Sequence, residues 1–466
     1  MVFSSLVFIC VFFPMIFLLY TILPWKSVRN GILIAASLLF YAYGEPVYVF
    51  LMLGSTLLNY FFGRMVGNKK ARCRKGKLFL GVAVNLLLLG VFKYAGMAVE
   101  TWNQLTGMGI PVPEITLPIG ISFFTFQAMS YVIDVYRGQV KAQKSYWKIL
   151  LYVSFFPQLI AGPIVKYRDI ALEIDRRKQN LTDISEGFRR FCLGLSKKVL
   201  ISNTVAVAAD AVFQMPMGRV NIVSAWIGAV AYLLQIYYDF SGYSDMAIGM
   251  GRMFGFHFRE NFHYPYSAGS IQEFWRRWHM SLSGWFKEYL YIPLGGNRKG
   301  KVRTNINKMI VFFCTGLWHG ASWTFVIWGL YHGAFLMLES ILPKKWKVPG
   351  FLRHLYTLLV VTVGFVFFRA DSIGQGWQMV KTMFTGFSFT PVMVTSSLQM
   401  LNPLFLVMTV LGCAGAMPVK EWVEKKGGWM KGMLEGFSYP VSLALLMLSI
   451  LSLSGGTYNP FIYFRF

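Results

Sequence analysis

The sequence predicts an all-α polytopic membrane protein with roughly ten or more membrane segments. Of its 466 residues, 55% are hydrophobic and 14% are charged, whereas a soluble domain carries about 25% charged residues. Several apolar runs reach or approach the roughly 20 residues that a helix needs to cross a bilayer. These runs are Val2–Leu23, Leu78–Phe92, Ile222–Phe240, Leu355–Phe368 and Val441–Leu453. The lipid bilayer is therefore the first partner that we expect.

The N-terminal region, to about residue 97, predicts four ordinary spans with clear hydropathy. The first of them, Met1–Leu23, lacks the basic stretch that opens a secretory signal. It also exceeds the apolar core of such a signal, which has about 7–15 residues. We therefore expect it to be a retained span rather than a cleaved signal peptide.

The basic residues give the chain a formal net charge of +25 and lie in short connections. The main clusters are Lys26–Arg29, Arg64–Lys77, Arg137–Lys148 and Arg298–Lys308, whereas Gly44–Pro46 and Glu100–Pro118 carry no Lys or Arg. This alternation follows the positive-inside rule. It predicts that Met1 lies outside and that Lys26, Lys69 and Lys141 lie in the cytoplasm. It also argues against nucleic acid as a partner.

The middle of the chain differs from the N-terminal region. From Leu117 to Asn180, and again from Tyr237 to Leu342, the apolar segments are short and interrupted by Gly, Pro and polar residues. Irregular backbone at membrane depth must meet protein or a water-filled cavity, because lipid cannot satisfy its polar groups. We therefore expect a central cavity walled by short, tilted or re-entrant helices.

Ser270–Tyr291 is expected to form an amphipathic helix, since Phe274, Trp278, Trp285 and Tyr289 recur at helical spacing. It is too polar to span, so it suits the cytoplasmic interface or a slanted entry into the bundle.

Asp371–Phe384 is expected to form a second amphipathic helix, with Asp371 as its N-cap. Met309–Leu342 could be one long tilted helix or two segments. The sequence contains no internal repeat.

His319 is the most informative single residue, because it lies in the apolar run Val311–Trp328. An ionisable group at such a position is costly to bury, and it marks a functional site by default. His332 follows it by thirteen residues. On one continuous helix the two would be about 20 Å apart and on roughly opposite faces. They would act together only if the chain broke at Gly329 or Gly333, so His332 could be structural or could support the site.

The other histidines and the cysteines do not predict a metal site. The six histidines show no His-x-x-x-His spacing, and the five cysteines form no Cys-x-x-Cys pair. We therefore expect neither a metal nor a disulfide. His257, His263 and His354 adjoin charged residues and are expected at the membrane interface.

His279 is the one credible companion of His319, because it lies on the mixed amphipathic segment where an imidazole could point into the cavity. A neutral histidine whose pKa is lowered by desolvation is a competent general base. The alternative is an imidazole that simply bonds a helix neighbour. Asp134, Asp239 and Asp245 at span ends could relay protons, but we expect them to be interfacial caps, which is the simpler account. No nucleophile elbow or phosphate loop is present.

Six motifs, in order along most of the chain, resemble those of the membrane-bound O-acyltransferases. The closest branch contains alginate O-acetyltransferase and the teichoic-acid D-alanylation protein. The motifs are Leu117–Gln127, Phe155–Pro163, Tyr238–Gly249, Phe274–Ser283, Leu317–Trp323 and Phe368–Asp371. The resemblance implies a ring of helices around a funnel across a thin part of the membrane. It also places the family's invariant histidine on His319 and a second family position on His279.

The resemblance further implies one membrane-embedded acyltransferase domain over residues 1–466. Its parts would be N-terminal spans at 1–97, a catalytic core at 117–342 and C-terminal helices at 354–466. Such a protein of the bacterial cell membrane would take an acetyl group from a cytoplasmic thioester, with acetyl-CoA as co-substrate and no other cofactor. The acceptor would be an extracellular polysaccharide, or a hydrolase-like partner protein that acetylates it. His319 would be the general base and His279 would orient the reactants.

Arg276, Arg277 or the basic residues of 295–308 could bind the phosphates of the donor.

Three alternative functions stay open at this point. The acyl group could be D-alanyl or another acyl group transferred to a cell-wall polymer. The protein could instead be a transporter or flippase of acylated glycan, which paired inverted repeats would support, although none is found. It could also be a structural assembly subunit.

Overall fold

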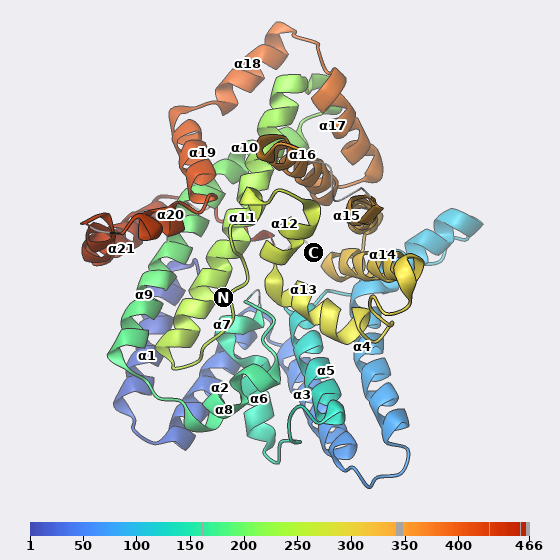
Figure 1. Cartoon of the computed structure of the whole chain (residues 1–466), viewed down its shortest axis with the longest axis vertical. Coiled ribbons are helices and arrows are strands. Elements are labelled where there is room, and N and C mark those ends of the chain that lie inside the picture. The colour runs from blue at the N-terminus through green and yellow to red at the C-terminus, as the bar shows by residue number, and fades with distance from the viewer. Residues whose placement is uncertain (161, 342–347, 428, 457, 463–466) are drawn as a thin grey trace. The chain divides into compact units, whose positions relative to one another are not determined.

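A computed structural model describes residues 1–466 except 161, 342–347, 428, 457 and 463–466 (Figure 1). Residue 161 of the Phe155–Pro163 motif and residue 342 of the predicted core therefore lie outside the described residues, as do the last four of the predicted C-terminal region. The described residues form helices and no strand, which confirms the all-α prediction. Unit 1 comprises Met1–Phe191 and Ser244–Arg259, and unit 2 comprises Cys192–Tyr243 and Glu260–Phe466. The prediction of a single domain stays a prediction.

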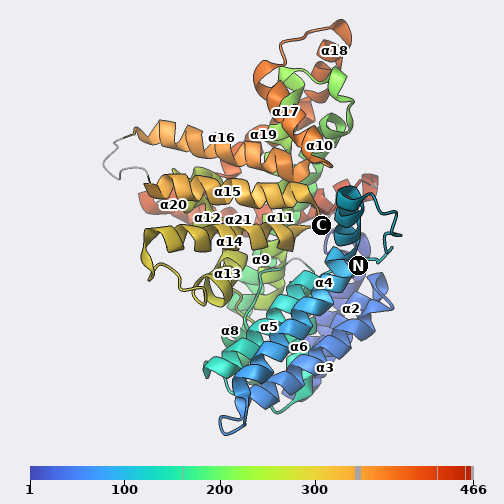
Figure 2. The same ribbon diagram turned by 90° about the vertical axis from the view of Figure 1, so that its right-hand side faces the viewer.

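Unit 1 begins with four helical segments where four spans were expected, of which Tyr48–Gly67 and Arg74–Thr106 are candidate spans by length and composition. The four segments are a π-helical turn η1 (Phe8–Phe12) with α1 (Phe13–Ile22), then α2 (Lys26–Gly44), α3 (Tyr48–Gly67) and α4 (Arg74–Thr106). Helices α3, α4 and α5 (Ile121–Arg137) lie side by side (Figure 2). Glycines allow this close approach, since a Cβ on Gly63 would lie 2.5 Å from the Tyr131 ring. Small residues at helix contacts are the usual means of packing in a membrane.

The rest of unit 1 confirms the prediction of short, broken segments between residues 117 and 180. After α5 the chain forms α6 (Tyr146–Ser154), α7 (Phe156–Leu159) and α8 (Tyr167–Arg176), and then enters α9 (Leu181–Ser196).

The same prediction is wrong at the start of the second region. Residues 237–253 belong to one continuous helix, α11 (Ile222–Met253), of 32 residues. Its glycines serve helix packing rather than helix breaks: a Cβ on Gly242 would lie 2.6 Å from the carbonyl oxygen of Gly194 on α9. Asp239 consequently lies within the helix and not at a span end.

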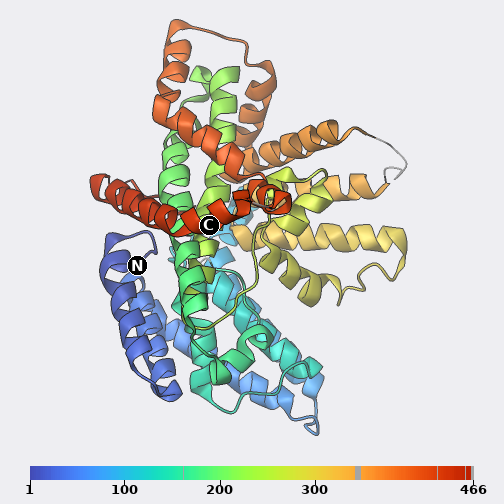
Figure 3. The ribbon, with the colours of Figure 1, turned by 60° about the vertical axis from the view of Figure 1, so that its left-hand side comes forward.

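Unit 2 is built around α11 and the helices that follow it. Its other elements are η2 (Lys197–Ser202), α10 (Asn203–Gln214), η3 (Met217–Arg219), η4 (Pro265–Ser267), α12 (Ile271–Arg277), α13 (Met280–Phe286), η5 (Lys287–Tyr291), α14 (Gly300–His319), α15 (Trp323–Ile341), α16 (Gly350–Arg369), α17 (Ile373–Thr385), α18 (Pro391–Met400), α19 (Pro403–Gly415), α20 (Val419–Lys426) and α21 (Trp429–Gly455). Figure 2 shows α14, α15 and α16 as successive neighbours. In Figure 3 the green α10 lies against orange helices, of which α19 is a contact.

Met309–Leu342 proves to be two segments as far as the chain is described, because α14 ends at His319 and α15 begins at Trp323. The turn depends on Gly320, where a Cβ would lie 2.1 Å from the Phe325 ring. One helical turn before Gly320, the backbones of α14 and α15 nearly touch: a Cβ on Gly316 would lie 2.3 Å from the Phe325 carbonyl oxygen. These glycines therefore fix where α14 stops, and so fix the position of His319.

The expected single helix over Ser270–Tyr291 is wrong. The chain forms α12, breaks at Trp278 and His279, and resumes as α13 and the π-helical η5. The hydrophobic stripe continues through the break, so periodicity alone could not reveal it. The helix expected over Asp371–Phe384 is confirmed as α17, but its N-cap is Ser372, whose Oγ accepts the Gln375 N–H at 3.1 Å, and not Asp371.

Among the described residues, seven helices are long and apolar enough to cross a membrane. An eighth span arises if α18 and α19, bent by 61°, count as one broken crossing. The sequence predicted about ten or more spans by counting shorter apolar runs, such as the one that forms Phe8–Ile22. The chain is thus a multi-pass membrane protein.

Candidate functional site

His319 lies at the C-terminal end of α14, in a setting made almost wholly of aromatic rings. Its ring centroid is 5.0 Å from Trp318, 5.1 Å from Trp328 and 5.2 Å from Phe368. The residue is 6% exposed. Because the C-terminal end of a helix carries partial negative charge, this position favours a positive charge on the imidazole.

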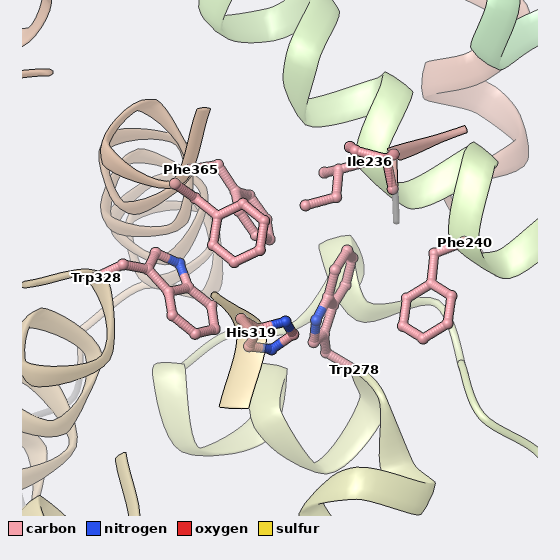
Figure 4. A pocket seen from close by; sticks show the side chains of 8 residues that line it. Ile236, Phe240, Trp278, His319, Trp328 and Phe365 are labelled. Carbon is pink, nitrogen blue, oxygen red and sulfur yellow. The ribbon is translucent and has the colours of Figure 1, made fainter. Parts of the chain in front are cut away.

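A small pocket lies against His319. Figure 4 shows the imidazole between the rings of Trp328 and Trp278. The described residues that line the pocket are Ile236, Phe240, Trp278, His319, Trp328, Phe365, Phe368 and Ile462. Among them His319 is the one whose side chain could act as an acid or a base near neutral pH.

His279 lies beside His319, at the break between α12 and α13. The two ring centroids are 6.4 Å apart with an interplanar angle of 62°. His279 has φ 42° and ψ 54°, in the left-handed region. A residue other than glycine is held there at a cost of order 1–3 kcal/mol, and such residues cluster at active sites. The strained break turns the imidazole out of helical register and toward His319.

Asn261 holds His279 in place. Its Oδ1 lies 3.1 Å from His279 Nδ1 and accepts hydrogen bonds from the backbone N–H of Ser281 at 3.2 Å and from the Ser281 Oγ at 2.8 Å. A backbone N–H can only donate, so the Asn261 atom at this position must be the oxygen. His279 Nδ1 must then carry a proton and donate it to Asn261.

The assignment leaves the lone pair of neutral His279 on Nε2. Nε2 is buried and has no hydrogen-bond partner among the described residues. His279 lies outside the candidate spans. Burial lowers the pKa of His279 well below 6.5, and a positive charge on His319 lowers it further. The imidazole is therefore neutral at pH 7, and the two histidines would share at most one added proton.

The start of α12 is fixed from two sides. The Ser270 Oγ accepts the Glu273 N–H at 3.1 Å, while the Glu273 carboxylate accepts the Gly269 N–H at 2.9 Å, as in a capping box. Glu339 of α15 accepts the N–H groups of Ile271 at 2.6 Å and Gln272 at 3.0 Å. These bonds tie α12, and hence His279, to the helix that follows His319.

Sequence reasoning missed both Asn261 and Glu339. The Ser270–Glu273 spacing does signal a helix start, but no local pattern marks the two remote side chains. Their role depends on contacts made by residues 18 and 67–68 positions away in the chain.

His332 does not line the pocket. It lies inside α15, fully buried, 5.2 Å from both the Trp275 and the Trp328 rings. A Cβ on Gly364 of α16 would lie 2.7 Å from its Nε2. The chain breaks at Gly320, and neither Gly329 nor Gly333 interrupts α15. His332 thus packs α15 against α16, with Trp328 between it and His319.

The arginines expected at the donor differ from each other. Arg277 is paired with Glu273 at 2.6 Å and donates to the Ser267 Oγ at 2.8 Å. Arg276 is exposed, as are Arg298, Lys299, Lys301 and Arg303. None of these residues lines the pocket, so their contact with a donor stays a prediction.

The histidines expected at the membrane interface make exposed or partly exposed contacts. His257 Nδ1 lies 2.8 Å from Glu173, and His263 Nε2 lies 2.8 Å from Glu421. Burial lowers the pKa of His257, but the carboxylates of Glu173 and Asp183 outweigh it and raise the pKa above 6.5. His354 Nδ1 lies 3.3 Å from the Ala268 carbonyl oxygen. The expectation that the protein uses no metal stays a prediction.

Comparison with known proteins identifies the family. The model of the membrane-bound O-acyltransferase family matches residues 124–370. The chain is 40% identical to the probable alginate O-acetylase AlgI of Pseudomonas putida, with all of both chains covered. It is 37% identical to the peptidoglycan O-acetyltransferase of Helicobacter pylori, over 82% of this chain and 80% of that one.

A more distant relative is the teichoic acid D-alanyltransferase of Bacillus subtilis, 28% identical over 54% of this chain and 67% of the relative. The matched family region contains both α12–α13 and α14–α15, and hence both histidines. The resemblance inferred from the six motifs is confirmed. The chain belongs to the membrane-bound O-acyltransferase family and is a multi-pass O-acyltransferase of the bacterial cell membrane.

Proposed function

We propose that the protein transfers an acetyl group from acetyl-CoA on the cytoplasmic side to a hydroxyl group of an extracellular polysaccharide. The observation that carries this proposal is the apolar pocket with His319 as its ionisable wall and neutral His279 next to it. Similarity to relatives named for O-acetylation of alginate and of peptidoglycan supports an acetyl group and a polysaccharide acceptor.

In the proposed reaction His319 is the general base. It removes the proton of the acceptor hydroxyl as the oxygen attacks the thioester carbonyl carbon. The tetrahedral intermediate then collapses, the carbon–sulfur bond breaks, and the proton on His319 passes to the departing thiolate. General acid–base catalysis of this kind contributes about 10²–10⁴-fold to a rate.

His279 orients His319 and stabilises its charged form. Asn261 keeps the Nδ1 proton of His279, so the free lone pair of Nε2 can accept a hydrogen bond from the His319 imidazolium. The location of His319 at the end of α14 supports the same charge. The surrounding rings exclude water, which strengthens these interactions and protects the thioester from hydrolysis.

The phosphates of acetyl-CoA would be held by exposed basic side chains. The segment Arg298–Lys308, with Arg276, presents such charges, and arginine pairs well with phosphate. Arg277 is a weaker candidate because Glu273 already pairs with it. A hydrolase-like extracellular partner would accept the acetyl group where the polymer does not reach the pocket.

The experiment uses purified protein in lipid nanodiscs with acetyl-CoA carrying a labelled acetyl group and a polysaccharide acceptor. The wild type should transfer label, and the His319→Ala variant should lose transfer while eluting and unfolding as the wild type does. Near-normal transfer by a folded His319→Ala variant would overturn the assignment of the base.

D-Alanyl transfer to a cell-wall polymer is the second candidate, and the Bacillus subtilis relative favours it. The same assay with a D-alanyl thioester as donor separates the two. We expect the acetyl donor to be preferred over the D-alanyl donor, since the described lining residues of the pocket include no carboxylate to pair with an ammonium group.

A further inference from the structure

The C-terminal segment Tyr458–Ile462 returns to the middle of unit 2, where Ile462 lines the same pocket as His319. Ile462 is 4% exposed and Phe461 is 6% exposed. The ring of Phe461 lies 4.5 Å from that of Tyr243 on α11. This short stretch is thus part of the pocket wall, although it lies more than a hundred residues beyond His319.

A buried ion pair fixes this segment. Lys198 Nζ lies 2.8 Å from the Asp239 carboxylate, and the two side chains are 1% and 2% exposed. The other carboxylate oxygen of Asp239 accepts the backbone N–H of Ile462 at 2.8 Å. Lys198 Nζ also donates to the carbonyl oxygen of Pro460. Each charge of the pair therefore binds the backbone of the segment.

Further contacts hold the segment on the α10 side. Asn203 accepts a hydrogen bond from Lys198 at 2.7 Å and donates to the Asn459 side chain at 3.1 Å. The Tyr458 hydroxyl donates to Asp210 at 2.6 Å. Lys198 itself lies in η2, a π-helical turn between α9 and α10. Such turns are rare and occur frequently at functional sites.

A buried ion pair is weak evidence for added stability, because desolvation offsets much of the attraction. Its value here is positional, since it sets the register of the segment and so decides which side chain reaches the pocket. Besides His319 and Ile462, the described lining residues are Ile236 and five residues with aromatic rings. Ile462 is thus one of two aliphatic walls, and it is the one carried by the anchored segment.

We propose that Ile462, held by Lys198 and Asp239, limits the acyl group that the pocket accepts to a short one. This inference rests on the proposed function, in which the pocket takes the acyl group of the donor. Truncation of Ile462 would leave space for further methylene groups. One methylene in an apolar pocket changes discrimination by about 10–200-fold, so the effect is large enough to measure.

The first test measures transfer from acetyl-, propanoyl- and butanoyl-CoA by the protein in nanodiscs. We expect Ile462→Ala to raise the ratio of butanoyl to acetyl transfer by about tenfold or more. Ile292→Ala is the matched control, because Ile292 is 48% exposed and does not line the pocket. An unchanged ratio in an active Ile462→Ala variant would overturn the inference.

The anchor is tested by Asn203→Ala, which removes contacts of Asn459 and Lys198 and leaves both members of the ion pair in place. It should shift the acyl ratio in the same direction as Ile462→Ala and by a smaller factor. Removing Lys198 or Asp239 alone would leave a buried unpaired charge and could prevent folding. The paired variant Lys198→Met with Asp239→Asn avoids this and should also relax acyl selectivity.

A second test of the position of the segment needs no substrate. Tyr243→Cys and Phe461→Cys, at rings 4.5 Å apart that take no part in the polar anchor, should be joined by a short bis-methanethiosulfonate reagent in a protein whose five native cysteines are replaced by serine or alanine. If the cross-link forms but wild type transfers none of the three acyl groups, the proposed donor is wrong and the position of the segment stands. If no cross-link forms, the inference is wrong. Loss of transfer on cross-linking, reversed by reduction, would contradict a fixed wall.

Discussion

His319 and His332 make an instructive comparison, because both are buried histidines of one helical hairpin and both touch Trp328. The ring centroids of the two histidines lie 5.1 Å and 5.2 Å from that of Trp328. His319 ends α14 and faces a pocket, whereas His332 lies inside α15 and packs against Gly364. Burial alone therefore does not distinguish the proposed base from a packing histidine in this protein. Access to a cavity and a second imidazole distinguish the two.

Replacing each histidine in turn is the most direct test of this comparison. His319→Asn should lower acyl transfer by about 10²–10⁴-fold, the usual contribution of a general base. Transfer by nanodisc-embedded protein, normalised to the folded fraction, is the measurement. If a folded His319→Asn variant keeps more than a tenth of the wild-type rate, the two histidines do not differ as described.

The second largest effect is expected at His279 and at its partner. His279→Ala should lower kcat by about 10²-fold. Asn261→Asp places a carboxylate on Nδ1 and should raise the pKa of His279, which burial and His319 otherwise lower. The acid limb of the pH–rate profile should therefore move to higher pH. An identical profile in an active Asn261→Asp variant would remove Asn261 from the mechanism.

His332 should affect stability more than chemistry. His332→Ala leaves a cavity between α15 and α16, and truncation of a large buried side chain costs about 2–5 kcal/mol. Thermal unfolding should occur at lower temperature, while kcat per folded molecule stays within about tenfold of wild type. Gly364→Ala, which crowds the same imidazole, should behave likewise. A selective loss of kcat in both variants would place His332 in the reaction.

The smallest effect concerns His257, which is exposed where the other two are buried. Glu173 and Asp183 raise its pKa above 6.5, so the protonated form is favoured in the folded protein. Its contribution to stability is complete below pH 6.5 and is lost as pH rises through the raised pKa. As the pH rises from 6.5 through the raised pKa of His257, the unfolding temperature of the wild type should fall slightly, whereas that of His257→Gln should not. His354→Gln should keep the wild-type slope.

Sequence reasoning reached the fold class and the two candidate histidines, because hydropathy and an ionisable residue in an apolar run are local signals. It misjudged features that depend on remote contacts. The α12–α13 break is held by Asn261 and Glu339, which no periodicity reports. The glycines of α11 looked like helix breakers but meet the backbone of α9. Asp239 looked like a helix cap but pairs with Lys198.

Chemical rescue tests the central claim most directly, because only a missing acid–base group is replaced by a soluble one. His319→Gly and His332→Gly are assayed for acyl transfer with and without added imidazole. We predict that imidazole raises the rate of His319→Gly by at least about tenfold, with a dependence on the pKa of substituted imidazoles, and leaves His332→Gly unchanged. Equal rescue of both variants, or near-wild-type transfer by His319→Gly without imidazole, would contradict the role of His319 as the base.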